Sequence, residues 1–355
     1  MNDRKTTAAG SLPNVSSISD DERYSRQVLF SGIGSQGQAR LLAAKVVIVG
    51  CGATGSAVAG LLARAGVGTL RIVDRDYVEA SNLQRQSLFD ESDAEQSIPK
   101  AAAAARKIAS FNSHIVVEPV IADLVPANVT ELLAHADLIL DATDNFETRY
   151  LVNDFAVQQG VPWIYTAAVG AYGLTMNIIP GETACLSCVF PAAPKGTVET
   201  CDTSGILNSA VNLFASIEAT EAMKFLVGAR DKVRRTMLSY DLWNNERSEM
   251  SVTKPRPDCE TCQRREFPYL AGEGRPQITL CGRNSVQIHE RHHPIAFVEL
   301  SDKLKGHGKV MHNDFVLKFW RDPYEMTLFP DGRAIIKGTT DTAIARSLYA
   351  RFIGS

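Results

Sequence analysis

The sequence predicts an α/β protein with a doubly wound, Rossmann-like, mostly parallel sheet, a Cys₄ zinc site and a small C-terminal α+β domain. An apolar run ends directly in a glycine-rich turn, and strands alternate with helices through the first half of the chain. Two Cys-x-x-Cys pairs follow this alternation. Because helices between parallel strands cover both faces of a sheet, the alternation predicts a mostly parallel sheet.

The first unit is a strand, a glycine-rich turn, a helix and a second strand. We expect strands at residues 45–49 and 70–74 and a helix at 56–65, with Gly50-Cys-Gly-Ala-Thr-Gly55 between the first strand and the helix. Such a unit ending in an acid, here Asp74, is typical of nucleotide binding, because backbone N–H groups there can approach phosphate closely. The glycine turn alone does not separate NAD, FAD, SAM and ATP binders, and it also fits a tight turn beside a solvated acid.

The alternation continues along the chain. We expect helices at 99–110, 129–135, 147–159 and 209–226, and strands at 115–122, 137–142, 163–169 and 236–242. Proline, glycine, threonine and cysteine dominate residues 180–205, which predicts a long ordered excursion from the alternating pattern.

The chain is expected to divide into a flexible tail (1–20), a first domain (21–266), a linker (267–278) and a C-terminal α+β domain (279–355). The C-terminal domain is expected to contain strands 285–289, 314–321, 324–328 and 333–337 and helices 295–305 and 342–352. Asp341 can cap the last helix.

The composition describes an ordinary globular protein, with 45% apolar and 22% charged residues. A net charge of −3 argues against general binding to nucleic acids or membrane surfaces. No apolar run approaches the roughly 20 residues of a membrane span. The polar start lacks a signal peptide and the seven cysteines are odd in number, so we expect a reducing, cytoplasmic setting.

The paired cysteines, Cys185 with Cys188 and Cys259 with Cys262, have the spacing of metal ligands. Two such pairs can supply a closed, tetrahedral Cys₄ zinc site. Because a closed site leaves zinc no open position, this metal would stabilise the fold and take no part in catalysis. Disulfides or buried free thiols are the alternatives.

Several charged residues indicate that the nucleotide is ATP. Asp74 can hydrogen-bond ribose hydroxyls, and the cations Arg85 and Lys100 can clamp a triphosphate. Asp144 follows the end of a predicted buried strand and can hold Mg²⁺. Hydride transfer needs no such clamp, which disfavours an NAD oxidoreductase. The alternative is that these residues are exposed surface charges.

An ordered set of motifs resembles a known family. The set comprises Arg23-Tyr-Ser-Arg-Gln27, the Gly50 turn, Ala65-Gly-Val-Gly-Thr69, Asp74-Arg-Asp76, Ser81-Asn-Leu-Gln-Arg-Gln86, Pro99-Lys100, Asp141-Ala-Thr-Asp-Asn145 and both cysteine pairs. Together, over residues 21–266, these motifs resemble the ThiF/MoeB/HesA group of E1-like adenylating enzymes, relatives of the ubiquitin activators.

The resemblance implies a reaction and partners. Such enzymes bind ATP·Mg²⁺ and the C-terminal Gly-Gly of a small ubiquitin-fold sulfur-carrier protein. The terminal carboxylate attacks the α-phosphate and gives an acyl-adenylate and pyrophosphate, which prepares the carrier for sulfur transfer. A sulfurtransferase is a possible further partner. Neither a membrane nor a nucleic acid is expected to take part.

The resemblance also implies roles for particular residues. It places Gly50, Gly52, Ala53, Gly55, Asp74 and Asp76 around the nucleotide, Asn82, Arg85 and Lys100 on the phosphates, and Asp144 on Mg²⁺. Arg26 matches an arginine that reaches the partner subunit's site, which implies a homodimer. On its own, Arg26 would be read as a solvated helix residue. Ala53 stands where glycine is more usual, and its methyl group is tolerable if φ is negative.

Cys201 lies where family members place a cysteine that can bond covalently with the carrier. Some members carry this cysteine and do not need it, so both readings stay open. The C-terminal domain lacks a rhodanese-like active loop, and it can dock a protein or add dimer contacts. The motifs do not specify the carrier, the sulfur source or the pathway, whether thiamine, molybdenum cofactor, cysteine or another thiolation.

Three other functions were weighed. One is a same-fold adenylyltransferase that acts on another carboxylate, such as a peptide C-terminus, or on tRNA. Another is a non-catalytic, heterodimerising E1-like scaffold, which the intact charged set disfavours. An NAD oxidoreductase would need bound nicotinamide.

Overall fold

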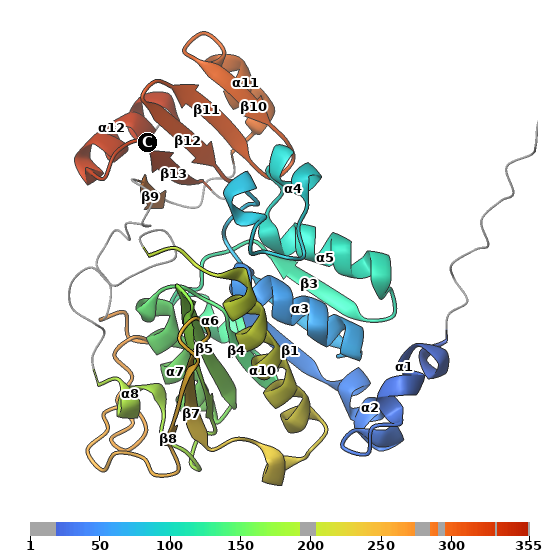
Figure 1. Cartoon of the computed structure of the whole chain (residues 1–355). Coiled ribbons are helices and arrows are strands. Elements are labelled where there is room, and N and C mark those ends of the chain that lie inside the picture. Colours follow the sequence, from blue (N-terminus) through green and yellow to red (C-terminus); the bar gives the residue numbers. More distant parts are fainter. Residues whose placement is uncertain (1–18, 192–203, 274–284, 290–294, 331, 354–355) are drawn as a thin grey trace, which may run out of the picture.

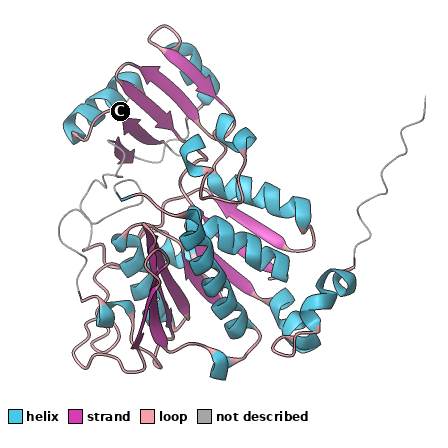
Figure 2. Cartoon of the chain, viewed as in Figure 1, coloured by secondary structure: helices cyan, strands magenta, loops and turns pink. Residues whose placement is uncertain are grey.

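The computed structural model describes residues 19–191, 204–273, 285–289, 295–330 and 332–353 (Figures 1 and 2). Two sheets organise them, one of eight strands and one of five. Cys201, the first part of the tail and most of the second half of the predicted linker lie outside the described residues.

The larger sheet has the order β3-β2-β1-β4-β5-β6-β7-β8. Its strands are β1 (Lys45–Val49), β2 (Thr69–Val73), β3 (Val116–Val120), β4 (Leu138–Asp141), β5 (Trp163–Val169), β6 (Tyr172–Ile178), β7 (Thr236–Asp241) and β8 (Glu246–Ser251). Pairing is parallel from β3 to β5 and antiparallel from β5 to β8. The predicted α/β class with a mostly parallel sheet is therefore confirmed.

Helices cover both faces of this sheet, as Figure 1 shows. The described helices of the first domain are α1 (Asp20–Val28), α2 (Gly34–Ala43), α3 (Ala53–Ala65), η1 (Ala80–Asn82), α4 (Glu91–Glu95), α5 (Lys100–Phe111), α6 (Val129–Leu132), α7 (Phe146–Gln159), α8 (Leu186–Val189), α10 (Asn208–Leu226) and η2 (Arg230–Lys232). Val46 and Ile48 of β1 pack in one core with α3, α5 and α10, and Val47 and Val49 pack in the other core with α7. Burial on both faces explains the unbroken apolar run of β1.

Several elements differ from the expectation. Strands β6 and β8 and helices α1 and α2 were not predicted, and α3 begins at Ala53 instead of residue 56. Every residue of β8 is exposed, so this edge strand lacks the apolar alternation by which strands are recognised. The turn between α1 and α2 exposes two large apolar side chains, Leu29 at 74% and Phe30 at 64%.

The C-terminal domain is an antiparallel sheet, ordered β10-β11-β12-β13-β9, with two helices. Its elements are β9 (Ser285–His289), α11 (Phe297–Leu304), β10 (Lys309–His312), β11 (Leu317–Arg321), β12 (Tyr324–Leu328), β13 (Arg333–Lys337) and α12 (Thr342–Phe352). Asp341 caps α12 as predicted, because its carboxylate accepts hydrogen bonds from the N–H groups of Ala343 and Ile344. Strand β10 was not predicted.

Residues 267–270, in the first half of the predicted linker, pack against the first domain. Tyr269 stacks on Tyr150 of α7 with ring centroids 4.8 Å apart, and its N–H donates to Asp154 Oδ2 at 2.9 Å. The first part of the segment is therefore held in place. Among the described helices, none has both the length and the hydropathy of a membrane span.

Candidate active site

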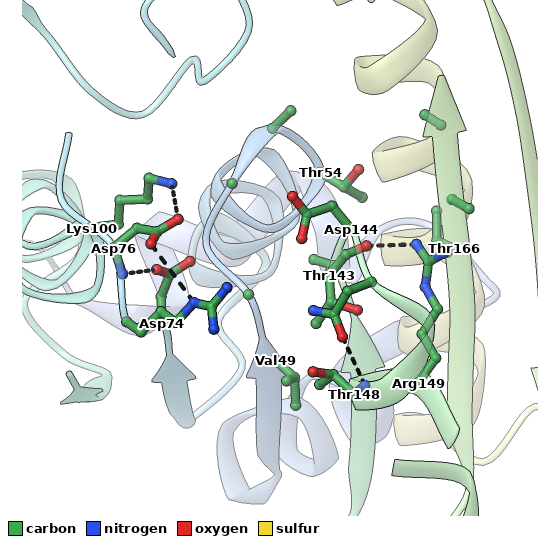
Figure 3. Close-up of a pocket in the computed structure, with 18 of the residues that line it drawn as sticks. Val49, Thr54, Asp74, Asp76, Lys100, Thr143, Asp144, Thr148, Arg149 and Thr166 are labelled. Atoms are coloured by element: carbon green, nitrogen blue, oxygen red, sulfur yellow. Dashed lines mark hydrogen bonds and ion pairs between the residues drawn. The ribbon is translucent and has the colours of Figure 1, made fainter. Parts of the chain in front are cut away.

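A cavity of about 470 Å³ opens at the carboxyl ends of β1, β2, β4 and β5. Ligands of open α/β sheets bind at this edge. Eight of the predicted nucleotide residues line it: Gly50, Gly52, Ala53, Asp74, Asp76, Arg85, Lys100 and Asp144. Figure 3 shows Asp74, Asp76 and Lys100 on one side of the cavity and Thr143, Asp144 and Arg149 on the other.

The glycine turn is shaped by close backbone approach. Gly50 has φ +91°, and a Cβ there would lie 2.6 Å from the carbonyl oxygen of Ala142. A Cβ on Gly55 would lie 2.0 Å from the carbonyl oxygen of Gly50. A Cβ on Gly52 would meet only Gln86 Nε2, at 4.0 Å, so this glycine leaves space for a ligand. Gly55 supports the turn without lining the cavity.

Ala53 is the first residue of α3 and belongs to the cavity wall. It is not among the described residues with positive φ, so its methyl group is accommodated without backbone strain. The first N–H groups of a helix have no intrahelical partner and suit an anion. The amino end of α3 therefore presents N–H groups to the cavity at the place where the sequence predicts phosphate.

Asp74 organises the turn opposite the helix. Its Oδ2 accepts a hydrogen bond from the Cys51 N–H (2.5 Å), and its Oδ1 accepts one from the Asp76 N–H (2.6 Å). Burial raises the pKa of this carboxyl group, which Lys100 and the two N–H donors oppose. Each carboxylate oxygen has a second lone pair, so Asp74 can still accept from a ribose hydroxyl.

The two predicted phosphate-binding cations both reach the cavity. Lys100, the first residue of α5, has a side chain only 5% exposed, and its Nζ lies 3.1 Å from Asp76 Oδ2. Arg85 donates from Nη1 to the carbonyl oxygen of Ser81 at 2.8 Å. Asn82 is fully buried and does not line the cavity, although its Nδ2 has no hydrogen-bond partner among the described residues.

Sequence reasoning missed Arg149, which stands beside Asp144 in the wall. Arg149 Nε donates to Asp141 Oδ2 at 2.9 Å and its Nη2 donates to the carbonyl oxygen of Thr143 at 2.5 Å. Burial raises the pKa of the Asp141 carboxyl group, and the neighbouring guanidinium opposes that shift. The available signal was an arginine inside the mainly buried helix that follows the Asp141–Asn145 motif.

Two further parts of the wall were also missed. The loop after β3 contributes Ala122, Asp123 and Leu124, which adjoin the Asp74 side. The other end is largely apolar, and its residues are Ala167, Val169, Tyr172, Leu174 and Ile206. The cavity thus has a charged end at β1, β2 and β4 and an apolar end at β5 and β6.

One predicted catalytic residue that the structure describes, Arg26, is not brought to this cavity. Arg26 is exposed on α1 and is absent from the cavity wall. Cys201 lies outside the described residues. An arginine remote from the site of its own chain is compatible with the predicted role in a partner's site.

The four predicted metal ligands converge in a cluster apart from the cavity. Their Sγ atoms all lie within 4.8 Å of one another, with Cys185–Cys259 at 3.6 Å and Cys188–Cys262 at 3.4 Å. These separations exclude disulfides. Zinc–sulfur bonds of about 2.3 Å in a tetrahedron place sulfurs about 3.8 Å apart, so the cluster fits zinc.

The fold and site define the class: a doubly wound α/β nucleotide-binding protein with an attached tetracysteine cluster. Comparison with known proteins then identifies the family. The ThiF family model matches residues 24–261, so the chain belongs to the ThiF family, as the ordered motifs predicted.

Three relatives illustrate the range of similarity. The sulfur carrier protein ThiS adenylyltransferase of Bacillus subtilis is 46% identical over 336 residues, which are 94% of this chain and 99% of that protein. The SAMP-activating enzyme E1 of Haloferax volcanii is 39% identical over 68% of this chain and 88% of its own length. The crystal structure of E. coli MccB with MccA-N7isoASN has a TM-score of 0.61 at 24% identity, covering 70% of this chain and 76% of that chain, and shows the shared fold.

Proposed function

We propose that this chain is an ATP-dependent adenylyltransferase that activates the C-terminal glycine carboxylate of a small ubiquitin-like sulfur-carrier protein. One observation carries the proposal: a single cavity joins a charged end, whose cations Arg85 and Lys100 suit a triphosphate, to an apolar end at β5 and β6. Identity of 46% to a ThiS adenylyltransferase across 94% of the chain supports it.

The chemistry follows from the two ends. The carrier's terminal carboxylate oxygen attacks the α-phosphorus of ATP, and the bond from that phosphorus to the bridging oxygen breaks. Pyrophosphate leaves with the bond's electrons, and the product is an acyl-adenylate. Arg85 and Lys100 stabilise the charge that develops on the leaving phosphates, and Asp74 holds the ribose.

Asp144 is our candidate ligand for Mg²⁺. It lines the cavity and forms no salt bridge with another described residue, which leaves its oxygens available to a hard cation. The bound ion would neutralise charge on the phosphates.

Zinc in the cysteine cluster would stabilise the fold alone, because four thiolates complete its coordination. All these thiolates require reducing conditions, which fits a cytoplasmic setting.

Exchange of labelled pyrophosphate into ATP tests the function. We expect exchange with one of the Gly-Gly-terminated small proteins encoded by the same genome, and a sulfurtransferase is then a candidate next partner. The matched control is the same carrier without its last glycine, which should support no exchange. Absence of exchange with the whole panel would contradict the proposal.

A homodimer with Arg26 acting across the interface is the second part of the proposal. Exposure of Arg26 beside the apolar pair Leu29 and Phe30 supports a protein contact at α1. Chains carrying Arg26→Ala and chains carrying Asp144→Ala should each be inactive, and mixing them should restore activity at a shared site. If the mixture stays inactive although both chains fold, Arg26 does not act in trans.

The proposed covalent role of Cys201 needs its own test. Thiolate attack on the acyl-adenylate would release AMP and leave a thioester between Cys201 and the carrier. Gel electrophoresis without reductant should show an ATP-dependent adduct that thiols remove and that Cys201→Ser lacks. An adduct-free reaction would indicate adenylation alone.

A further inference from the structure

The loop between β2 and α5, residues 74–99, delivers most of the charged end of the cavity. Together with the first residue of α5 it presents Asp74, Asp76, Arg85 and Lys100. Its two ends are joined, because the Val78 N–H donates to the carbonyl oxygen of Ile98 and the Lys100 N–H donates to that of Asp76. The C-terminal domain contacts this β2–α5 loop at three points.

The first contact encloses Tyr77, which directly follows Asp76. Its ring is buried against Val316 and Phe329 of the C-terminal domain. Lys318 Nζ lies 4.1 Å from the ring centroid, within the range of a cation–π interaction. The Tyr77 hydroxyl lies 3.4 Å from Thr327 Oγ1.

The second contact is an ion pair between the two domains. Lys337 Nζ lies 2.5 Å from Glu79 Oε1, with side-chain exposures of 25% and 18%. Burial disfavours the charged amine, but Tyr77 and the Glu79 carboxylate outweigh that effect and raise the pKa of Lys337. Lys337 is therefore charged at neutral pH.

Glu79 transmits this contact to the phosphate-binding residues. Its N–H donates to Asn82 Oδ1 at 3.2 Å, and its carbonyl oxygen accepts from the Asn82 N–H at 2.8 Å. The carbonyl oxygen of Asn82 in turn accepts from the Arg85 N–H at 3.0 Å. A continuous chain of polar contacts thus runs from Lys337 to the backbone of Arg85.

The third contact lies near the other end of the loop. Asn313 Nδ2 donates to the carbonyl oxygen of Gln96 at 2.7 Å. In addition, Ser285, Ile335 and Lys337 themselves line the cavity. A domain attached only for stability could pack on any surface, whereas this one contacts the loop beside the charged end and completes the cavity wall.

We propose that the C-terminal domain helps to form the ATP site and that Lys337 is a positioning residue. Through Glu79, Lys337 holds the β2–α5 loop in the conformation in which Arg85 and Lys100 contact the triphosphate. This inference rests on the proposed function, because it takes ATP as the ligand of the cavity. Lys337 acts through Glu79 and is not assigned a contact with the phosphates.

Direct ATP titration of the full-length protein, without any carrier, tests the inference. Lys337→Met should weaken ATP binding about tenfold, because the largely buried ion pair between Lys337 and Glu79 is lost. Lys337→Arg keeps the charge and should restore affinity to within about twofold. Lys305→Met, which changes an exposed lysine paired with the exposed Asp302, is the matched control and should bind ATP as the unaltered protein does.

A double-mutant cycle separates positioning from simple stability. Glu79→Gln should weaken ATP binding about as much as Lys337→Met, and the double variant should be no weaker than the worse single variant. In pyrophosphate exchange the effect should fall on the KM for ATP, with kcat changed less than about threefold. Thermal unfolding in the same buffers verifies that the titrated protein is folded.

Three results would overturn or separate the inference about Lys337. Unchanged ATP affinity in folded Lys337→Met, or a loss that Lys337→Arg also shows, overturns the inference. Additive losses in the double variant also overturn it, because the two residues would then act separately. Failure of the proposed function is distinguishable, since in that case the unaltered protein would not bind ATP and Arg85→Ala would change nothing.

Discussion

The cavity lies mainly in the domain that also holds the cysteine cluster, but the two sites are built in opposite ways. The cavity gathers charged groups at strand ends, and its floor leaves space at Gly52 for a ligand. The cluster gathers four thiols around one point where a metal ion fits, and none of them lines the cavity. The comparison suggests that chemistry and stability are assigned to different regions, and each prediction below tests that division.

The largest expected effect is on stability, from loss of the metal. Zinc held by four thiolates contributes on the order of 10 kcal/mol to folding. A strong chelator, or Cys262→Ser, should therefore lower the melting temperature sharply and abolish activity only as a consequence. Calorimetry with and without added zinc measures this, and restored folding on adding zinc to the chelated protein is the control. An unchanged melting temperature after verified metal removal would contradict the assignment of stability to the cysteine cluster.

The second prediction concerns the charged end of the cavity. Lys100→Met should reduce pyrophosphate exchange about 10²-fold or more, because it removes a buried cation that we propose binds the phosphates. Its melting temperature should change little, since Asp76, its salt-bridge partner, is partly exposed and can be solvated by water. Lys232→Met, at a surface lysine 72% exposed, is the matched control. A large fall in the melting temperature of Lys100→Met without loss of pyrophosphate exchange would show that Lys100 serves stability and not chemistry.

The smallest expected effect concerns Glu218, buried in α10. Burial, followed by the nearby Asp141, raises its pKa well above the ordinary value of 4.5. Above about pH 4.5, Glu218 therefore keeps its proton in the folded state and loses it in the unfolded state. The free energy of unfolding falls as pH rises, by up to about 1.4 kcal/mol per pH unit, until the pH passes the pKa of Glu218 in the folded state. Glu218→Gln should flatten this part of the stability–pH curve.

Denaturant unfolding from pH 4 to pH 9 measures the Glu218 effect. Exchange activity at neutral pH serves as the second readout and should stay within about threefold of the unaltered protein. An unaltered slope in the variant would show that Glu218 ionises alike in both states.

The parallel half of the fold was predictable because its signals are local. Strand β1 is an unbroken apolar run that meets a glycine turn, and Asp74 directly follows the next strand, β2. The exposed strand β8 carries no such signal and was missed. The cysteine cluster was predictable because each pair has the spacing of metal ligands on its own.

The missed site residues depend on contacts between distant parts of the chain. Lys337 meets Glu79 across a separation of 258 residues, which no local pattern encodes. Arg149 is the exception, because its ion-pair partner Asp141 is only eight residues away in the chain. Ile206 and Tyr172 meet at the cavity because of how the strands turn back in the antiparallel half.

The salt bridges around the cavity have a consequence for selectivity. In the structure, Lys100 is paired with Asp76 and Lys337 with Glu79. A single small anion, such as chloride or inorganic phosphate, must compete with carboxylates that are held in place. A polyphosphate offers several charges on one molecule, so if the end of α3, Arg85 and Lys100 bind it together as we propose, these ion pairs would favour ligands that carry several charges.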